Sequence, residues 1–360
     1  MSYPFLGLGF NSWTQKFSRG SAAAAAAVAA FLEYVTTSDT SSFTLLSTGT
    51  VDYEVDWGDG TTESLTTNNP THTYSSAGEY TIKVTPAEGS TYRPYFNNAV
   101  SDTSIASVSG TGGSQLGTNI GDAWEGASNM TSFSSNIDIP SVTNFRYTWS
   151  GCSSLTSFPL IDTSSGVFLN GTWNGCSSLT SFPQLDTSSG TSFNFTWYGC
   201  YSLTSFPLLN TSSGTSFDSA WRDCTGLTSF PQLDVSSGTN FAGAWRNCTG
   251  LISFPLLNTS SVTTFLSAWQ SCSGLTSFPA NMFDTTGTLV STAFANAFST
   301  CSLTAQSIEN ILVSLDTNGA SNITLGISGG SNAGYSTWTA AAQTALANLQ
   351  GKGWTVAYNA

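Results

Sequence analysis

The chain has 360 residues and a formal net charge of −13, because 8 Lys and Arg residues stand against 21 Asp and Glu residues. Only 8% of its residues are charged and 13% are aromatic, whereas an average soluble protein has about 25% charged residues. The scarcity of basic residues excludes nucleic-acid binding and attraction to an anionic membrane. The aromatic content excludes a chain without a packed core.

Residues 1–38 are predicted to form an N-terminal anchoring segment. The first residues are apolar and interrupted by glycine, and the candidates for docking into a partner protein are Tyr3, Phe5, Leu6, Phe10 and Trp13. A run of alanines predicts a short helix over residues 20–35, because alanine is the best helix former. A retained export signal is the weaker alternative, since Lys16 and Arg19 precede this apolar run.

Residues 39–100 follow a different pattern, with apolar and polar residues in alternation between glycine-containing turns. This pattern predicts a small β-sandwich. The motifs Trp-Gly-Asp-Gly at 57–60, His-Thr-Tyr at 72–74 and Gly-Glu-Tyr-Thr at 78–81 resemble those of PKD domains, which have an immunoglobulin-like fold. The resemblance implies a structural role for His72 and a spacer or weak binding role for the domain. We interpret Asp56 and Asp59 as turn formers, with a metal pair as the alternative.

Residues 101–303 contain an internal repeat. Cysteines recur every 24 residues from Cys152 to Cys272, and Cys301 follows after 29. A tryptophan column has the same period: Trp149, Trp173, Trp197, Trp221, Trp245 and Trp269. Columns of Leu and of Phe followed by Pro accompany it, and incomplete copies around Trp124 and Phe298 flank the array. Such a period predicts stacked coils with one continuous core, in which the cysteines are small buried residues and not disulfide or metal ligands.

One repeat predicts a strand and a helix. Leu-Thr-Ser-Phe alternates in polarity and suits a short strand, which the following Pro ends. Phe217, Trp221 and Cys224 stand at helical spacing after an Asn-Thr-Ser-Ser start signal. The pattern Phe-x-x-Ala-Trp-x-x-Cys-x-x-Leu-x-x-Phe-Pro resembles BspA-type leucine-rich repeats of bacterial surface proteins and some bacteriophage structural proteins. The resemblance implies an α/β solenoid, leucine-rich-repeat-like with 24-residue coils, that displays binding surfaces.

Residues 304–360 are predicted to form an α/β C-terminal cap. Apolar spacing indicates a helix over residues 305–315 and a second, alanine-rich helix over 339–349. Residues 323–327 and 354–358 have the composition of strands. Such a unit would cover the last hydrophobic face of the stack.

Three sets of surface residues are candidates for function. An Asp/Asn column is interpreted as a turn and capping position, with a calcium or glycan ladder as the alternative: Asp162, Asp186, Asn210, Asp234 and Asn258. A threonine column would suit an ice-binding face, but Ile252 interrupts it. Variable positions near the Trp column gather Arg and Tyr, which are favoured at binding hot spots. The candidate receptor-binding residues are Arg146, Tyr147, Tyr198, Tyr201, Arg222 and Arg246, with a solvated surface as the alternative.

No catalytic set is found in the sequence, which has a single histidine and neither a nucleophile elbow nor an HExxH motif. We therefore expect a non-enzymatic bacteriophage virion protein, a tail fibre or a capsid fibre or decoration protein, without cofactor or metal and without membrane insertion. Its N-terminus would dock on other virion structural proteins, and its repeats would bind a host surface glycan or protein. A trimer is the expected oligomer of a fibre. The alternatives are a bacterial cell-surface adhesin, which needs an export signal that we do not find, and, more weakly, a glycan-degrading tailspike-type enzyme.

Overall fold

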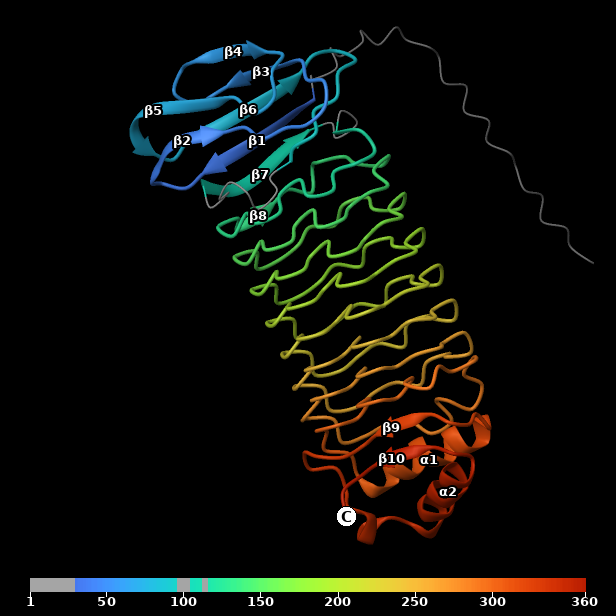
Figure 1. Cartoon of the computed structure of the whole chain (residues 1–360). Helices are drawn as coiled ribbons and strands as arrows, with labels where there is room; N and C mark the ends of the chain where they lie inside the picture. The colour runs from blue at the N-terminus through green and yellow to red at the C-terminus, as the bar shows by residue number, and fades with distance from the viewer. Residues whose placement is uncertain (1–29, 96–103, 112–115) are drawn as a thin grey trace, which may run out of the picture.

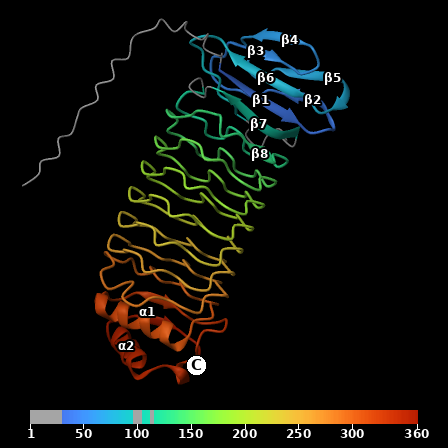
Figure 2. The same ribbon diagram turned by 180° about the vertical axis from the view of Figure 1, so that it is seen from behind.

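A computed structural model describes residues 30–95, 104–111 and 116–360. A β-rich N-terminal domain, a long stack of coils and an α/β C-terminal unit follow one another along an elongated molecule (Figures 1 and 2). None of the helices in these residues combines the length and apolarity needed to cross a bilayer. The expected docking residues all lie outside the described residues: Tyr3, Phe5, Leu6, Phe10 and Trp13.

The helix expected over residues 20–35 is wrong at its C-terminal end, because Phe31–Thr36 forms strand β1. Leu32, Tyr34 and Thr36 are buried while the residues between them are partly exposed, which is the two-residue period of a strand. Strand β1 pairs with a strand on each side and so lies inside the sheet. The β-rich domain therefore starts before residue 39, and the expected N-terminal segment of residues 1–38 includes one of its central strands.

The N-terminal domain contains two sheets. The larger has the strand order β4-β3-β6-β1-β7-β8. Its further strands are β3 (Tyr53–Asp56), β4 (Thr62–Leu65), β6 (Thr81–Pro86), β7 (Ile105–Thr111) and β8 (Ser132–Phe133). The smaller sheet pairs β2 (Thr40–Thr44) with β5 (Thr71–Gly78). Tyr34, Tyr53 and Trp57 are buried in the core of this domain, which confirms the predicted β-rich fold.

Strands β7 and β8 join the N-terminal domain to the stack. Strand β7 pairs antiparallel with β1 and parallel with β8, which belongs to the first coil. The backbone N–H groups of Thr131 and Ser134 donate to β7 carbonyls at 2.9 Å. Phe133 of β8 then stacks on Phe158 of the next coil at 6.1 Å. The sheet of the domain therefore continues into the stack, and β7 covers the hydrophobic end of the first coil.

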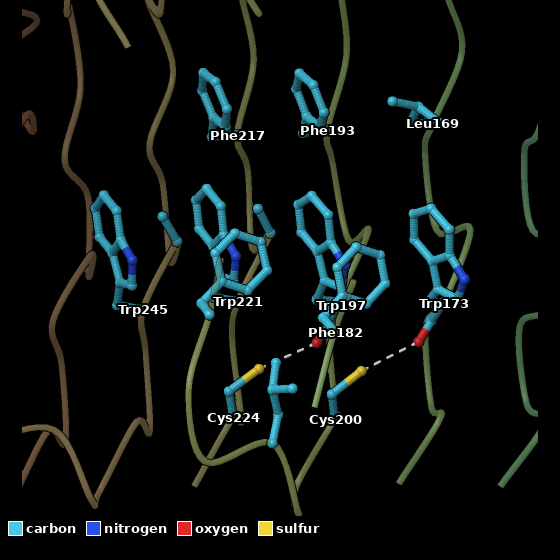
Figure 3. Close-up of a cluster of buried hydrophobic side chains, with 14 of the residues drawn as sticks. Leu169, Trp173, Phe182, Phe193, Trp197, Cys200, Phe217, Trp221, Cys224 and Trp245 are labelled. Atoms are coloured by element: carbon cyan, nitrogen blue, oxygen red, sulfur yellow. Dashed lines mark hydrogen bonds between the residues drawn. The ribbon is translucent and has the colours of Figure 1, made fainter. Parts of the chain in front are cut away.

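The core of the stack consists of columns of identical side chains (Figure 3). From Trp124 to Trp269 consecutive indoles lie 5.3–5.9 Å apart, nearly parallel, and Phe298 continues the column at 4.9 Å. The Phe column from Phe133 to Phe278 repeats at 5.7–6.2 Å and meets the indoles edge-on. Edge-to-face and offset stacking are the favoured arrangements of aromatic rings. Each coil thus packs its aromatic residues against one another and against those of both neighbouring coils.

The seven cysteines form a third column. All are buried and none forms a disulfide, which confirms their predicted place in the core. Each Sγ lies 3.0–3.3 Å from the carbonyl oxygen of a column Trp in the preceding coil, to which its thiol donates (Figure 3). Cysteine therefore fills a small buried position and also supplies a weak hydrogen-bond donor between coils.

The prediction of a helix in each repeat is wrong, because consecutive turns take its place. Around Trp149, the N–H groups of Thr148, Ser150 and Cys152 each donate to the carbonyl three residues earlier in the same coil. The N–H groups of the residues between them donate to the next coil, as Trp149 does to Thr172 at 2.9 Å. Half of these N–H groups therefore bond between coils, whereas a helix would keep them within one coil.

Left-handed backbone conformations explain why the turns do not become helix. In all eight coils the residues two before and two after the column Trp or Phe298 have positive φ, between +51° and +85°. The column before Trp is Asp122, Tyr147, Gly171, Phe195, Ser219, Gly243, Ser267 and Asn296. The column after Trp is Gly126, Gly151, Gly175, Gly199, Asp223, Asn247, Ser271 and Thr300. Since Gly and Asn adopt this conformation most readily, these columns carry the turn signal of the repeat.

The predicted Leu-Thr-Ser-Phe strand forms little regular sheet. In each of several coils a single backbone bond joins this segment to its neighbour, as from Thr204 to Thr180 at 3.3 Å. The following proline has no N–H group to extend the pairing. A more regular ladder runs along the other side of each coil, where parallel bridges join Asn144, Phe168, Ser192, Ser216, Asn240 and Thr264 in sequence.

The C-terminal unit contains the four predicted elements, α1 (Ala305–Asn318), β9 (Thr324–Gly326), α2 (Ala340–Gly351) and β10 (Thr355–Ala357). Strand β9 pairs in parallel with β10 and bridges Phe294 of the last coil. Helix α1 buries Ile308, Ile311 and Leu312. Its polar side chains bond to free backbone groups of the last coil, as Ser307 does to Phe278 and Thr276. These contacts satisfy a backbone edge that a further coil would otherwise pair.

Candidate binding face

The turns beside the Trp column carry a set of exposed or partly exposed aromatic residues. We call this set the aromatic strip: Tyr147, Phe168, Phe195, Tyr198 and Tyr201. Tyr147 and Phe195 are each 37% exposed and Tyr201 is 50% exposed. The strip follows the ladder of parallel bridges, in which Phe168 itself takes part. Its side chains therefore stand on hydrogen-bonded turns, a more rigid support than a long loop.

Three of the six predicted receptor-binding residues lie together. Tyr198, Arg222 and Arg246 occupy the same position in consecutive coils, and the Arg222 guanidinium carbon lies 5.4 Å from the centre of the Tyr198 ring. The Nε atom of Arg222 also lies 3.7 Å from the carboxylate of Asp223. Partial burial, followed by the nearby Asp223 carboxylate, raises the pKa of Tyr198. The hydroxyl of Tyr198 therefore stays protonated and lies beside the Asp223 carboxylate.

The other predicted residues extend this group along the stack. Tyr201 bends back over Gly199, where an added Cβ would lie 3.8 Å from its ring. Arg146 and Tyr147 stand two coils away from Tyr198, and Arg146 lies 5.7 Å from the centre of the Phe168 ring. The structure therefore brings the six residues to one side of the stack, as two neighbouring groups.

Sequence reasoning missed Phe168 and Phe195, which lie between these two groups. Phe195 contacts Tyr198 with ring centres 6.2 Å apart, and Phe168 is 44% exposed. A signal for Phe195 was present in the repeat. It stands in a column otherwise made of Gly, Ser, Asp, Asn and Tyr, where a buried Phe has no place.

The Asp/Asn column forms turns, as the favoured interpretation predicts, although no helix follows them. The side-chain Oδ1 atoms of Asp162, Asp186 and Asn210 accept from the N–H group two residues later at 3.0–3.2 Å. Asp234 and Asn258 do the same. Hydrogen bonds from Ser188 and Ser236 lower the pKa values of Asp186 and Asp234, so both are ionised at neutral pH.

An open groove runs along this Asp/Asn edge. It has a volume of about 780 Å³, and its lining includes Leu160, Gln184, Leu208 and Gln232. Leu and Gln alternate here from coil to coil, and Leu160 is 66% exposed. Across residues 30–95, 104–111 and 116–360, no three His, Cys, Asp or Glu side chains are grouped closely enough to hold a metal ion.

The lone histidine holds a turn of the N-terminal domain. His72 stacks on Trp57 with ring centres 5.0 Å apart, and its Nε2 atom lies 2.8 Å from Asp59 Oδ2. Hydrogen bonds from Thr61, and then from His72, lower the pKa of Asp59 to about 2. Asp56 accepts from the Gly58 N–H group. Both aspartates therefore form turns, as predicted.

One part of the chain matches a known protein family. Residues 22–92 match the PKD domain family, a range that includes strands β1 to β6 and the pair His72–Asp59. The comparisons found no match to a curated protein and no match to a solved structure. The chain thus carries an N-terminal PKD-like domain joined to a stack of 24-residue coils.

Proposed function

We propose that this chain is a non-enzymatic adhesion protein of a bacteriophage virion and binds the host cell surface through the aromatic strip and its arginines. The aromatic strip is the observation that carries the proposal. The strip and its arginines gather Tyr, Phe and Arg side chains on one side of the stack, and Tyr and Arg are enriched among the residues that dominate the binding energy of interfaces. Three of the chain's 8 Lys and Arg residues stand on this side.

The fold supports a display role. Under this proposal the stack is a leucine-rich-repeat-like solenoid of the BspA type, whose short turns replace the expected helices. Its coils keep the buried columns constant and vary the exposed positions beside Trp, as Tyr198, Arg222 and Gln270 illustrate. A constant core with variable surface residues is the usual design of a repeat protein that binds a partner.

The seven buried cysteines, none of which forms a disulfide, favour assembly of the virion in a reducing cytoplasm. Disulfides form in oxidising compartments, whereas cytosolic thiols stay reduced. All seven thiols are buried in the folded chain and none forms a disulfide, and an exported unfolded chain would expose them to oxidation. A virion protein folds before the cell lyses and avoids that exposure. A bacterial surface adhesin with the same repeat must cross the envelope first.

Two measurements test the proposal. Mass spectrometry of purified virions and of host envelope fractions shows where the native chain is found, and recovery in the envelope alone would leave the bacterial adhesin. Binding of labelled full-length chain to host cells tests the strip. Replacing Tyr198 and Arg222 together by Ala should weaken binding at least about thirtyfold, as expected for a hot-spot pair. Tyr335→Ala is the matched control, because Tyr335 is 38% exposed in the C-terminal unit.

A further inference from the structure

Tyr147 and Phe195 adopt a backbone conformation that bulky side chains rarely take. Their φ values are +51° and +56°, and the same position in the other coils is Gly, Ser, Asp or Asn. A large exposed residue in this region is an outlier that costs stability. Such outliers persist mainly where the residue serves a binding site. The two rings are therefore the most informative positions of the aromatic strip.

The two rings are arranged for a ligand that runs along the stack. They stand in the same column two coils apart, a separation of about 10 Å at the usual spacing between strands. Gly171 lies between them, and a Cβ at this position would overlap the Tyr147 ring. Tyr147 therefore leans over Gly171 along the stack, toward the coil of Phe195. A linear polymer with repeating units could contact both rings at once.

The neighbouring rings of Phe168 and Tyr198 differ from these two rings because an arginine lies over each of them. Arg146 lies over Phe168 and Arg222 lies over Tyr198, at 5.7 and 5.4 Å. No described residue places a cation over Tyr147 or Phe195 in the same way. The arginines hold the flanking rings in place, while the exposed part of each outlier ring, 37% in both, has no cation of the described residues over it and stays available to a ligand.

The surroundings of the strip indicate the chemistry of that ligand. Amide and hydroxyl groups line it, and the Asn170 side chain donates to Ser192 Oγ at 2.7 Å. Asn194 Oδ1 accepts from Ser216 Oγ at 2.6 Å. A sugar ring has an apolar C–H face that stacks on an aromatic ring and hydroxyls that bond to amides and guanidinium groups. The carboxylate of Asp223 beside Arg222 offsets the positive charge, which disfavours an anionic polymer.

From these observations we infer that the ligand of the proposed adhesion function is a neutral, extended carbohydrate, two sugar rings of which stack on Tyr147 and Phe195. The inference rests on the proposed function and assigns its ligand class. It also adds Phe195 to the binding residues.

Affinity electrophoresis of the full-length chain tests this inference. Native gels contain dextran, mannan or hydroxyethylcellulose as neutral probes and polygalacturonate as the acidic probe. We expect at least one neutral probe to retard the chain. Tyr147→Ala and Phe195→Ala should each weaken this retardation about fivefold or more, while Tyr147→Phe and the control Tyr335→Ala should retain it. Circular dichroism of every variant checks that the stack is folded.

The remaining outcomes overturn the inference in distinguishable ways. Retardation by polygalacturonate alone would show an anionic ligand. Neutral retardation that survives the loss of both rings would place the site elsewhere. If host cells bind the chain through Tyr147 and Phe195 but no neutral probe does, the inferred ligand class is overturned and the adhesion function stands. If host cells do not bind the chain at all, the proposed function itself fails.

Discussion

Substitution of Gly171 by Ala tests whether the Tyr147 ring rests on the backbone of the next coil. Gly171 has φ +62°, and an added Cβ would overlap the Tyr147 ring. Gly243 is a matched control because it occupies the same column with φ +60°, and a Cβ there would meet only Ser219 Oγ at 3.1 Å. The two variants therefore share the backbone strain and differ in the aromatic overlap.

The expected magnitudes follow from these two contributions. An alanine with positive φ costs about 1–2 kcal/mol, and the less flexible unfolded chain returns about 0.4–1 kcal/mol. Gly243→Ala should therefore lower the free energy of unfolding by about 1 kcal/mol. Gly171→Ala must also displace a Tyr ring that is 37% exposed. Full exposure of that ring uncovers on the order of 120 Å², which adds up to ~3 kcal/mol.

Urea unfolding followed by tryptophan fluorescence measures the difference, because the column tryptophans report the stack. The double variant Tyr147→Ala/Gly171→Ala supplies the second check. Relative to Tyr147→Ala alone, the double variant should lose no more free energy of unfolding than Gly243→Ala loses relative to the unsubstituted chain. Equal losses for Gly171→Ala and Gly243→Ala, or no relief in the double variant, would refute the placement of the ring.

Three further predictions concern the core, the C-terminal unit and the N-terminal domain. Burial raises the pKa values of the thiols from Cys176 to Cys301. A thiol reagent should therefore react with none of the seven cysteines in the folded chain and with all seven after unfolding. A reactive thiol in the folded chain at neutral pH would contradict the buried column. Asn332 is buried and bonds to the backbone of Phe298, Leu303 and Ile327. Asn332→Ala should therefore lower the free energy of unfolding, measured in a urea titration, by about 2–4 kcal/mol. The same substitution at the exposed Asn348 should lower it by less than about 0.5 kcal/mol. The pKa of Asp59 is lowered from 3.8 to about 2, so the ionised carboxylate stabilises the fold above the ordinary pKa, and this stabilisation is lost as the pH falls toward 2. Melting temperatures of Asp59→Asn measured against pH should lack this acid loss. A parallel acid decline in both proteins would contradict the role of Asp59.

The sequence predicts the core of the stack well but not its secondary structure. The 24-residue period identifies the columns of Trp, Phe and Cys, because each coil can bury these residues only against identical neighbours. The spacing of Phe217, Trp221 and Cys224 also fits a helix, since consecutive turns and a helix both return to one face within four residues. Gly, Asn, Asp and Ser two residues on either side of the column Trp are the signal that distinguishes them. These residues accept positive φ, which no helix interior tolerates.

The candidate site could be predicted only in part, for a related reason. Arg222 and Tyr198 are found from the sequence because they are variable residues at one position of a constant repeat. Phe195 escapes because an apolar residue near a Trp column is assigned to the core by default. Its exposure follows from the left-handed turn, which places the side chains of both Tyr147 and Phe195 on the surface. A prediction of the turn would therefore have predicted the site.

The direction of the bonds between coils determines how the molecule responds to mechanical load. These bonds join each coil to the next, as Trp149 does to Thr172 at 2.9 Å, and so they lie along the axis of the stack. A pull between the ends would stretch them directly and open one coil at a time. Each opened coil of 24 residues would extend to about 80 Å, compared with the ~5 Å it occupies when stacked. A protein that tethers one particle to another would then absorb a sudden load by lengthening in steps, with the other coils still folded.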